Sequence, residues 1–263
     1  MVQEQLVGWH GTIREFIDED RSTVRKALEQ FIDDAGKSQI RAWRDSIPMI
    51  QGVLNSMKVL NKNKGAIVDD GTLLEYVLPM EGGRRPDVLV LENGIVIILE
   101  LKGKHQCNLA DIDQALGYKR DLENYHSVCQ DAQHPVYTIV VPTRKEDDYT
   151  EMDGAFIAGP HDLPKLLAKL TQESDYPSLN AEHFLKGEYL PLPSLIKAAK
   201  LHFLHSDLPQ IRKASANTDP AYNRCEEIIK ESHSTGRRKL ILLSGVPGSG
   251  KTLVGIRLSY EAE

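Results

Sequence analysis

The chain has 263 residues, of which 41% are hydrophobic and 27% are charged, and its 38 acidic residues outnumber its 32 lysines and arginines. This composition is typical of a globular protein with a real core, large enough for one domain or two. The net charge of -6 argues against a protein that holds nucleic acid by overall charge alone, although it leaves room for a local basic groove.

Neither the N-terminus nor any internal stretch predicts a membrane segment. No run approaches the roughly 18 consecutive apolar residues of a spanning helix, and the first residues lack the basic-then-apolar order of a signal peptide. Cys107, Cys129 and Cys225 are odd in number and far apart, so they suggest neither a disulfide framework nor a zinc ribbon. We therefore expect a soluble, cytoplasmic protein with no membrane partner.

Residues 1 to 37 predict a helical extension. Thr12 opens the sequence T-I-R-E, which is typical of a capping box, and Ser22 precedes a second amphipathic pattern. A further amphipathic stretch begins near residue 38 and carries Trp43 on its apolar stripe. Because Pro48 lies in the middle of this stretch, we expect the helix to kink there or to restart as a second helix.

From residue 71 the pattern changes to short runs rich in Val, Ile and Leu. Three of these runs predict consecutive strands, at Thr72 to Leu78, Asp87 to Leu91 and Ile95 to Leu101. Asn93 and Gly94 separate the last two runs, and this dipeptide favours a tight hairpin.

The chain after this hairpin alternates between helix and strand. A helical pattern from Asn108 to about Val128 precedes a buried strand from Pro135 to Val141, and residues 155 to 158 are a candidate for one more strand. Further helices are expected at residues 162 to 170 and 193 to 204. The order helix, three strands, helix, strand predicts an α/β fold for the domain at residues 38 to 190.

Charged residues at the ends of two predicted strands form a first candidate site. Asp87 begins the second strand, while Glu100 and Lys102 lie two residues apart at the end of the third, so their side chains leave the same face. Hairpin pairing brings these strand ends together. Two carboxylates suit Mg²⁺ or Mn²⁺, and a lysine can polarise water or stabilise developing charge, as phosphodiester hydrolysis requires. An ordinary solvated Glu/Lys pair is the alternative interpretation.

The next predicted helix adds polar groups near this site. Gln114 and Tyr118 are four residues apart and therefore share one helix face, with Asp111 one turn earlier. An amide and a phenol in this position could hold a substrate strand or support a metal ligand. A partly exposed helix face would explain the same residues.

The sequence P-D, twelve residues, E-L-K, followed by Q-x3-Y on the next helix, resembles the PD-(D/E)XK nuclease superfamily and specifically its RecB-like branch. The resemblance covers roughly residues 38 to 145 and implies a restriction-endonuclease-like core. It implies that Asp87 and Glu100 are metal ligands, that Lys102 is the catalytic lysine, and that Gln114 and Tyr118 form the accessory motif. The expected partner is nucleic acid, with DNA favoured over RNA.

Other charged residues are weaker candidates. Glu75 ranks lower as an additional metal ligand because it comes too early for the motif, and Asp45 is a weak candidate for the acidic residue that some relatives carry on the first core helix. Basic residues flank the proposed site and could contact a phosphate backbone, although each also suits an ordinary surface position: Arg84, Arg85, Lys104, Lys119 and Arg120.

A glycine-rich loop forms a second candidate site. A polar, proline-containing stretch near residues 206 to 220 predicts a boundary, with residues 191 to 218 as a helix and linker and a new unit at 219 to 263. There, a predicted strand from Leu240 to Leu243 precedes a G-x4-G-K-[ST] motif and a helix, which is the context of an ATP-binding phosphate loop. The phosphate-binding residues are Gly245, Gly248, Gly250, Lys251 and Thr252.

The later acidic ligand and the water-positioning group of an NTPase do not follow Thr252. We therefore expect the N-terminal part of a longer protein, with a truncated P-loop segment and no ATPase activity of its own. A nuclease ahead of such a segment resembles bacterial or phage nuclease-helicase proteins, including Schlafen-like DNA/RNA helicases. The prediction is thus a metal-dependent nuclease domain. The alternatives are a non-cleaving module that grips nucleic acid for a motor, and a nucleotide-binding regulatory protein whose N-terminal domain only mediates assembly.

Overall fold

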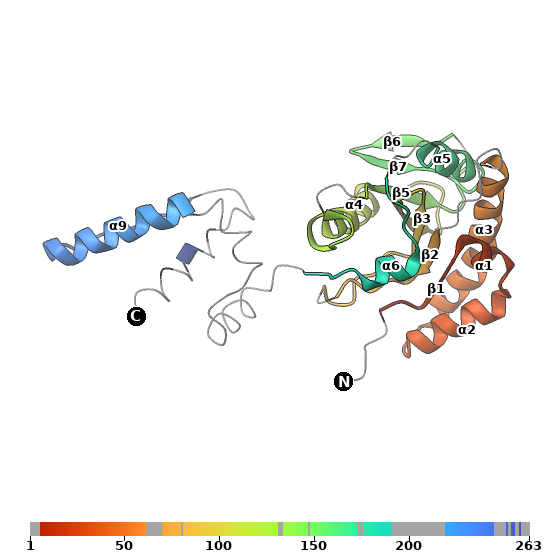
Figure 1. The fold of residues 1–263 in the computed structure, drawn as a ribbon, viewed down its shortest axis with the longest axis horizontal. Coiled ribbons are helices and arrows are strands. Elements are labelled where there is room, and N and C mark those ends of the chain that lie inside the picture. The colour runs from red at the N-terminus through yellow and green to blue at the C-terminus, as the bar shows by residue number, and fades with distance from the viewer. Residues whose placement is uncertain are drawn as a thin grey trace. The chain divides into compact units, whose positions relative to one another are not determined.

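The computed structural model of the protein describes residues 6–61, 70–79, 81–130, 134–146, 148–172, 176–190 and 219–244, together with residues 251, 254, 255 and 258. The chain divides into two compact units, Met1–Pro191 and Leu192–Glu263. The first unit is a mixed α/β structure with helices packed around a central sheet, which confirms the predicted α/β class (Figure 1).

The central sheet is mixed and has seven strands in the order β1-β2-β3-β4-β5-β7-β6. Strands β1 to β4 pair in antiparallel fashion, β5 is parallel to both β4 and β7, and β6 is an antiparallel edge strand. The strands are β1 (Trp9–Gly11), β2 (Gly71–Leu74), β3 (Val88–Glu92), β4 (Ile95–Lys102), β5 (Val136–Pro142), β6 (Thr150–Met152) and β7 (Ala155–Ile157). The strands predicted between residues 72 and 158 are all present, although their bounds differ, whereas the sequence pattern does not predict β1 and β6.

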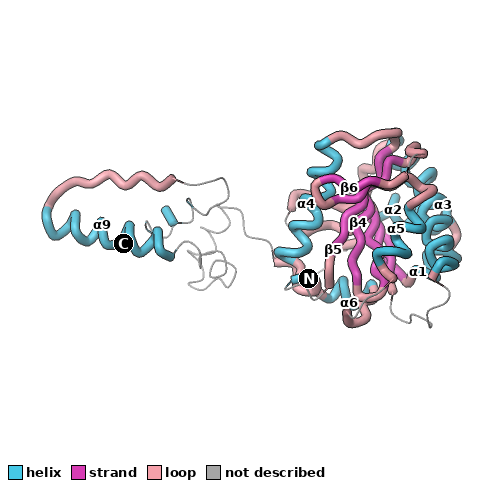
Figure 2. The backbone as a smooth tube through the Cα atoms, turned by 90° about the horizontal axis from the view of Figure 1, so that it is seen from above, coloured by secondary structure: helices cyan, strands magenta, loops and turns pink. Residues whose placement is uncertain are grey.

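Helices cover both faces of this sheet (Figure 2). They are α1 (Ile13–Asp18), α2 (Arg21–Phe31), α3 (Lys37–Leu60), α4 (Leu109–Tyr125), α5 (Leu163–Leu170) and α6 (Ala181–Lys186). Val88 and Val90 of β3 belong to the core that α1, α2, α3 and α5 cover, while Leu89 and Leu91 belong to the core under α4 and α6. Successive side chains of a strand leave opposite faces, so a run of apolar residues serves two cores.

Local sequence explains most of the helix and turn boundaries. Thr12 and Glu15 form the predicted capping box of α1, and Asp20, two residues before Ser22, caps α2. The predicted hairpin is confirmed: Asn93 and Gly94 both have left-handed φ angles, of 53° and 71°.

Two predicted features of the first unit differ in the structure. The helix α3 does not restart at Pro48 but runs through it, because the burial of its apolar stripe, including Trp43 and Ile47, outweighs the hydrogen bond that proline cannot make. The strand predicted to reach Leu78 ends at Leu74, because Glu75 has a left-handed φ of 55° that breaks the extended backbone.

The second unit contains the helix α9 (Asp219–Thr235). The strand predicted at Leu240 to Leu243 is not formed, and Leu240 and Leu242 are more than four-fifths exposed, because the described residues provide no strand for this segment to pair with. The helix predicted at residues 193 to 204 lies outside the described residues.

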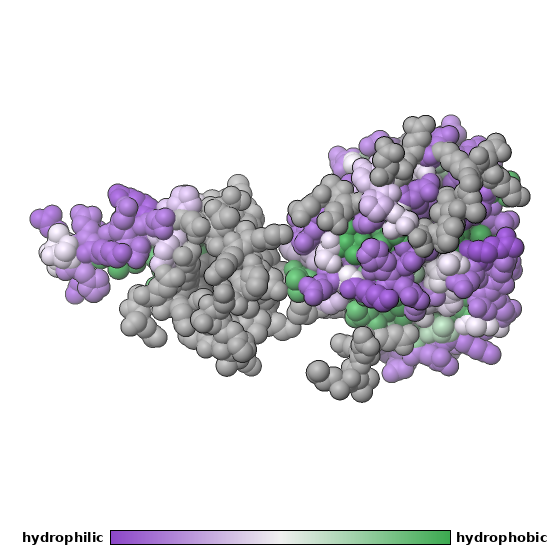
Figure 3. Space-filling model, viewed as in Figure 1, coloured by the Kyte–Doolittle hydropathy of each residue, from purple (hydrophilic) through white to green (hydrophobic). Residues whose placement is uncertain are grey.

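The surface of the described residues in Figure 3 is mainly hydrophilic, with smaller hydrophobic areas on the first unit. Among the helices that the structure describes, none combines the length and the apolar character needed to cross a membrane.

Candidate functional site

The register of β3 and β4 brings the predicted site residues to one end of the sheet. Val88 pairs with Leu99, so Asp87, which precedes Val88, lies at the end of β4 that carries Glu100 and Lys102. The Asp87 carboxylate accepts a hydrogen bond of 2.7 Å from the backbone N–H of Leu101. This bond holds the first carboxylate against the strand that carries the second.

Lys102 joins the strand end to the helix α4. Its Nζ donates hydrogen bonds of 2.9 Å to Glu100 Oε1 and of 2.9 Å to Gln114 Oε1. Gln114 Nε2 in turn donates to the Tyr118 hydroxyl at 3.0 Å. The structure therefore joins Glu100, Lys102, Gln114 and Tyr118 in one hydrogen-bonded network, and the Leu101 backbone holds the Asp87 carboxylate beside it.

The carboxyl groups of Asp87 and Glu100 lie close together, and the positive charge of Lys102 compensates their negative charge only in part. Burial and repulsion by Glu100 raise the pKa of Asp87 well above its ordinary value. Burial also raises the pKa of Glu100, and the hydrogen bond and charge of Lys102 offset this rise only in part. Burial opposes the positive charge of Lys102 as well, but its hydrogen bond to Glu100 and the attraction of Glu100, Asp87 and Asp111 together outweigh burial and raise the pKa of the lysine. A further cation beside the carboxylates would stabilise their ionised forms.

One oxygen of Glu100 has no partner. Its carboxylate is buried, and Oε2 lies within the protein with no hydrogen-bond donor among the described residues. An unpaired buried acceptor costs free energy unless a donor or a cation reaches it. Glu100 Oε2 and the Asp87 carboxylate are hard oxygen ligands, which suit Mg²⁺ or Mn²⁺.

The described residues form no group of three or more His, Cys, Asp or Glu side chains that could hold a metal ion. Magnesium commonly binds through one or two carboxylates and takes its other ligands from water and substrate phosphates. The pair formed by Asp87 and Glu100 fits this kind of site.

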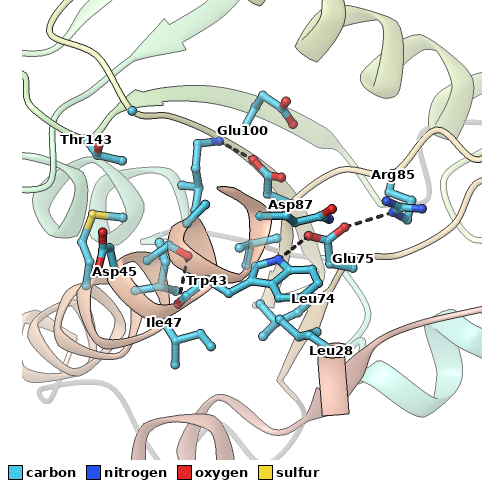
Figure 4. A pocket seen from close by; sticks show the side chains of 18 of the residues that line it. Leu28, Trp43, Asp45, Ile47, Leu74, Glu75, Arg85, Asp87, Glu100 and Thr143 are labelled. Atoms are coloured by element: carbon cyan, nitrogen blue, oxygen red, sulfur yellow. Dashed lines mark hydrogen bonds and ion pairs between the residues drawn. The ribbon is translucent and has the colours of Figure 1, made fainter. Parts of the chain in front are cut away.

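Glu75 lies next to the site, but both of its oxygens are used elsewhere (Figure 4). Oε1 accepts a hydrogen bond of 2.7 Å from the indole N–H of Trp43, and Oε2 accepts one of 3.0 Å from Arg85 Nε. The backbone N–H of Glu75 donates to the Asp87 carbonyl at 3.0 Å. Glu75 therefore connects α3 and the loop before β3 to the backbone of Asp87.

A cavity of about 770 Å³ opens beside these residues, between α3 and the strand ends. Its walls include the carboxylates of Asp87 and Glu100 together with Gln114 and Tyr118. Asp45 also faces it, but its side chain is exposed and pairs with Arg44 at 3.2 Å. The carboxylates thus adjoin a space large enough for part of a substrate.

Only some of the basic residues that were expected to flank the site line the cavity. Lys104 pairs with Asp111 at 2.5 Å and Lys119 approaches Glu123 at 3.8 Å, and neither lysine lines the cavity. Arg84 and Arg85 do line it, as does a residue that was not predicted, Arg144. Arg144 follows β5 in a loop, where no sequence pattern marks it.

The predicted phosphate loop is described only at Lys251, which has helical backbone and a partly buried side chain. Gly245, Gly248, Gly250 and Thr252 lie outside the described residues.

Comparison of the chain with protein-family models, with curated proteins and with solved structures finds no match. The function must therefore be inferred from the site itself.

Proposed function

We propose that the first unit is a metal-dependent nuclease domain that hydrolyses phosphodiester bonds in nucleic acid, with DNA as the favoured substrate. One observation carries the proposal. Two acidic groups with raised pKa values, Asp87 and Glu100, meet a lysine at a sheet end that opens into a cavity, and an unpaired oxygen of Glu100 lies among them. Groups with perturbed pKa values in a cleft are candidates for catalysis.

Asp87 and Glu100 would hold Mg²⁺ or Mn²⁺. When bound, such an ion activates water and neutralises charge on a phosphoryl oxygen. The hydrogen bond from the Leu101 backbone fixes the Asp87 carboxylate in place before an ion arrives.

Lys102 would orient the attacking water and stabilise the negative charge that develops on the phosphate. Its hydrogen bonds to Glu100 and Gln114 position the ammonium group, and burial does not discharge it, because Glu100 raises its pKa. Tyr118 holds Gln114 through the hydrogen bond between them and so would act as a positioning residue.

The arrangement of elements also supports the proposal. The order α3, β2, β3, β4, α4, β5 is the order that a restriction-endonuclease-like core requires, and the proposed residues come from β4, from the position before β3, and from α4. We further propose that residues 219 to 263 belong to a P-loop NTPase or helicase domain that binds ATP and Mg²⁺, on the evidence of the G-x4-G-K-T motif.

The test is incubation of the purified chain with linear and circular DNA, and with RNA, in Mg²⁺ or Mn²⁺. Asp87→Ala and Lys102→Ala should each abolish cleavage, whereas Asp18→Ala and Lys165→Ala, which change exposed residues outside the cavity, should cut as the wild type does. Circular dichroism would check that every variant is folded.

Cleavage that survives both site substitutions would overturn the proposal. Salt-sensitive binding without cleavage would favour the second candidate function, a module that grips nucleic acid for a motor without cutting it.

A further inference from the structure

Most of the charged side chains that line the cavity have a partner of opposite charge, but one does not. Glu75 pairs with Arg85 and Asp45 pairs with Arg44. Under the proposed function, a divalent cation compensates Asp87 and Glu100. The remaining charged residues of the lining are Arg84 and Arg144.

The Arg84 side chain already makes contacts within the protein. Its Nη1 pairs with Asp121 of α4 at 2.6 Å, and its guanidinium lies over the Tyr118 ring, 5.2 Å from the ring centroid. Gly117 leaves room for this arrangement, since a Cβ there would come within 2.8 Å of Arg84 Nη2. These contacts fasten the loop before β3 to α4, which is a structural role.

Arg144 differs because its side chain is exposed and makes no hydrogen bond or ion pair with the residues that the structure describes. It is therefore the uncompensated positive charge of the cavity wall. Phosphate groups are the anions that a polynucleotide presents, and the guanidinium fork matches their geometry.

The backbone around Arg144 is held firmly beside the site. Thr143 N–H donates to the Lys102 carbonyl at 2.8 Å, and Arg144 N–H donates to the Lys104 carbonyl at 3.2 Å. On its other side, the turn packs against Gly159, where a Cβ would lie only 2.3 Å from the Lys145 carbonyl oxygen. The turn thus keeps a fixed position relative to Lys102, as a substrate-binding residue requires.

We infer that Arg144 binds a backbone phosphate of the nucleic-acid strand, on the β5 side of the phosphate that is cut, and that Arg84 does not. This inference rests on the proposed function for its substrate. It adds a phosphate-binding residue that lies outside the catalytic network.

The test measures binding of a fluorescently labelled single-stranded DNA by anisotropy over a range of KCl concentrations at constant Mn²⁺. All variants carry Lys102→Ala, so that binding is measured without cleavage. Arg144→Gln should reduce the slope of log Kd against log salt by about 0.7 and weaken binding about fivefold at 0.1 M salt. Arg144→Lys should keep most of the slope, because it keeps the charge.

Two further variants separate this role from a structural one. Arg84→Gln should leave the salt slope unchanged and lower the midpoint of thermal unfolding. Arg14→Gln, at an exposed position of α1 outside the cavity, should change neither quantity.

The inference would be overturned if Arg144→Gln and Arg14→Gln gave the same slope of log Kd against log salt. It would also be overturned if Arg84→Gln lowered that slope as much as Arg144→Gln does. If the wild type cuts DNA but Arg144 has no effect on the slope, the inference fails and the nuclease stands. If the protein neither cuts nor binds DNA or RNA, both fail together.

Discussion

Two clusters, each with two carboxylates and one lysine, lie at opposite ends of the central strands. At one end, Lys58 meets Asp70 and Glu92, the last residue of β3. At the other end, Lys102 meets Glu100, with Asp87 beside them at the start of β3. The residue types are the same, so any difference in behaviour must come from geometry.

We call the first cluster closed because its lysine bonds to both acids, although Glu92 Oε1 is buried without a partner among the described residues and burial raises the pKa of Glu92. Lys58 Nζ reaches both acids, at 2.6 Å from Asp70 and 2.9 Å from Glu92, and the other oxygen of Asp70 accepts the backbone N–H of Ile13. Burial opposes the charge of Lys58, but attraction to Glu92 and Asp70 outweighs it and raises the pKa of the lysine. The cluster fastens α3 and α1 to the sheet, and stability is its evident use.

We call the second cluster open because its lysine bonds to only one of the two acids. Lys102 bonds to Glu100 and to a neutral amide, and its attraction to Asp87 does not prevent the pKa of that carboxyl from rising. This cluster also adjoins the cavity, through Asp87 and Glu100. Both clusters hold a glutamate with a raised pKa and a buried oxygen that has no partner among the described residues. Only the second cluster has an acid, Asp87, to which its lysine does not bond, and only the second adjoins the cavity, so we expect a metal ion there.

The largest expected effect comes from breaking the closed cluster. Lys58→Met should lower the free energy of unfolding by about 3–5 kcal/mol, because it leaves two buried carboxylates without their cation. Urea unfolding would measure the loss. Lys165→Met, at an exposed position of α5, should change the free energy by less than about 0.5 kcal/mol. A loss below about 1 kcal/mol for Lys58→Met would show that the closed cluster is not a stabilising one.

A smaller effect on stability should come from the binding of a metal ion at the open cluster. Mn²⁺ at 100 times its dissociation constant should stabilise the wild type by about 2.7 kcal/mol, because it binds the folded state and relieves the carboxylate repulsion. The double variant Asp87→Asn, Glu100→Gln should lose this response. Thermal unfolding with and without Mn²⁺ would measure it. Equal stabilisation of the double variant would place the metal elsewhere.

The open cluster could be predicted from the sequence because local rules determine it. The Asn93-Gly94 turn sets the register that brings Asp87 to the end of β4, and helical spacing puts Gln114 and Tyr118 on one face. Each of these steps depends on residues that are near in sequence or joined by a tight turn.

The surroundings of the site could not be predicted, because they depend on distant contacts. The bond between Trp43 and Glu75 joins residues 32 positions apart, and no local sequence pattern marks the left-handed φ of Glu75. Periodicity predicts that Trp43 lies in the core, but it does not predict where the indole N–H finds an acceptor. The edge strands β1 (WHG) and β6 (TEM) have three residues each and lack the apolar run that marks the equally short β7 (AFI).

The smallest effect should be a gain in stability from removing one charge of the open cluster. Asp87→Asn should raise the free energy of unfolding of the metal-free protein by about 1 kcal/mol at neutral pH, the usual size of a single-substitution effect. The reason is that asparagine removes the repulsion with Glu100 that raises the pKa of Asp87. Urea unfolding without metal would measure the gain, and Asp18→Asn on α1 serves as the exposed control. A destabilised Asp87→Asn variant would show that the carboxylate is satisfied without a metal ion.

The gain in the free energy of unfolding from Asp87→Asn should depend on pH, and its direction follows from the raised pKa of Asp87. The pKa of Asp87 is higher in the folded chain than the ordinary 3.8, so between the two values the folded state holds more protons than the unfolded state. The free energy of unfolding of the metal-free wild type should therefore fall as pH rises from about 4 through the raised pKa. Asp87→Asn should lack this part of the fall, so the difference between the two proteins should vanish in acid and grow toward neutral pH. Saturating Mn²⁺ should weaken the dependence in the wild type, since a bound cation lowers the pKa of the carboxyl that holds it.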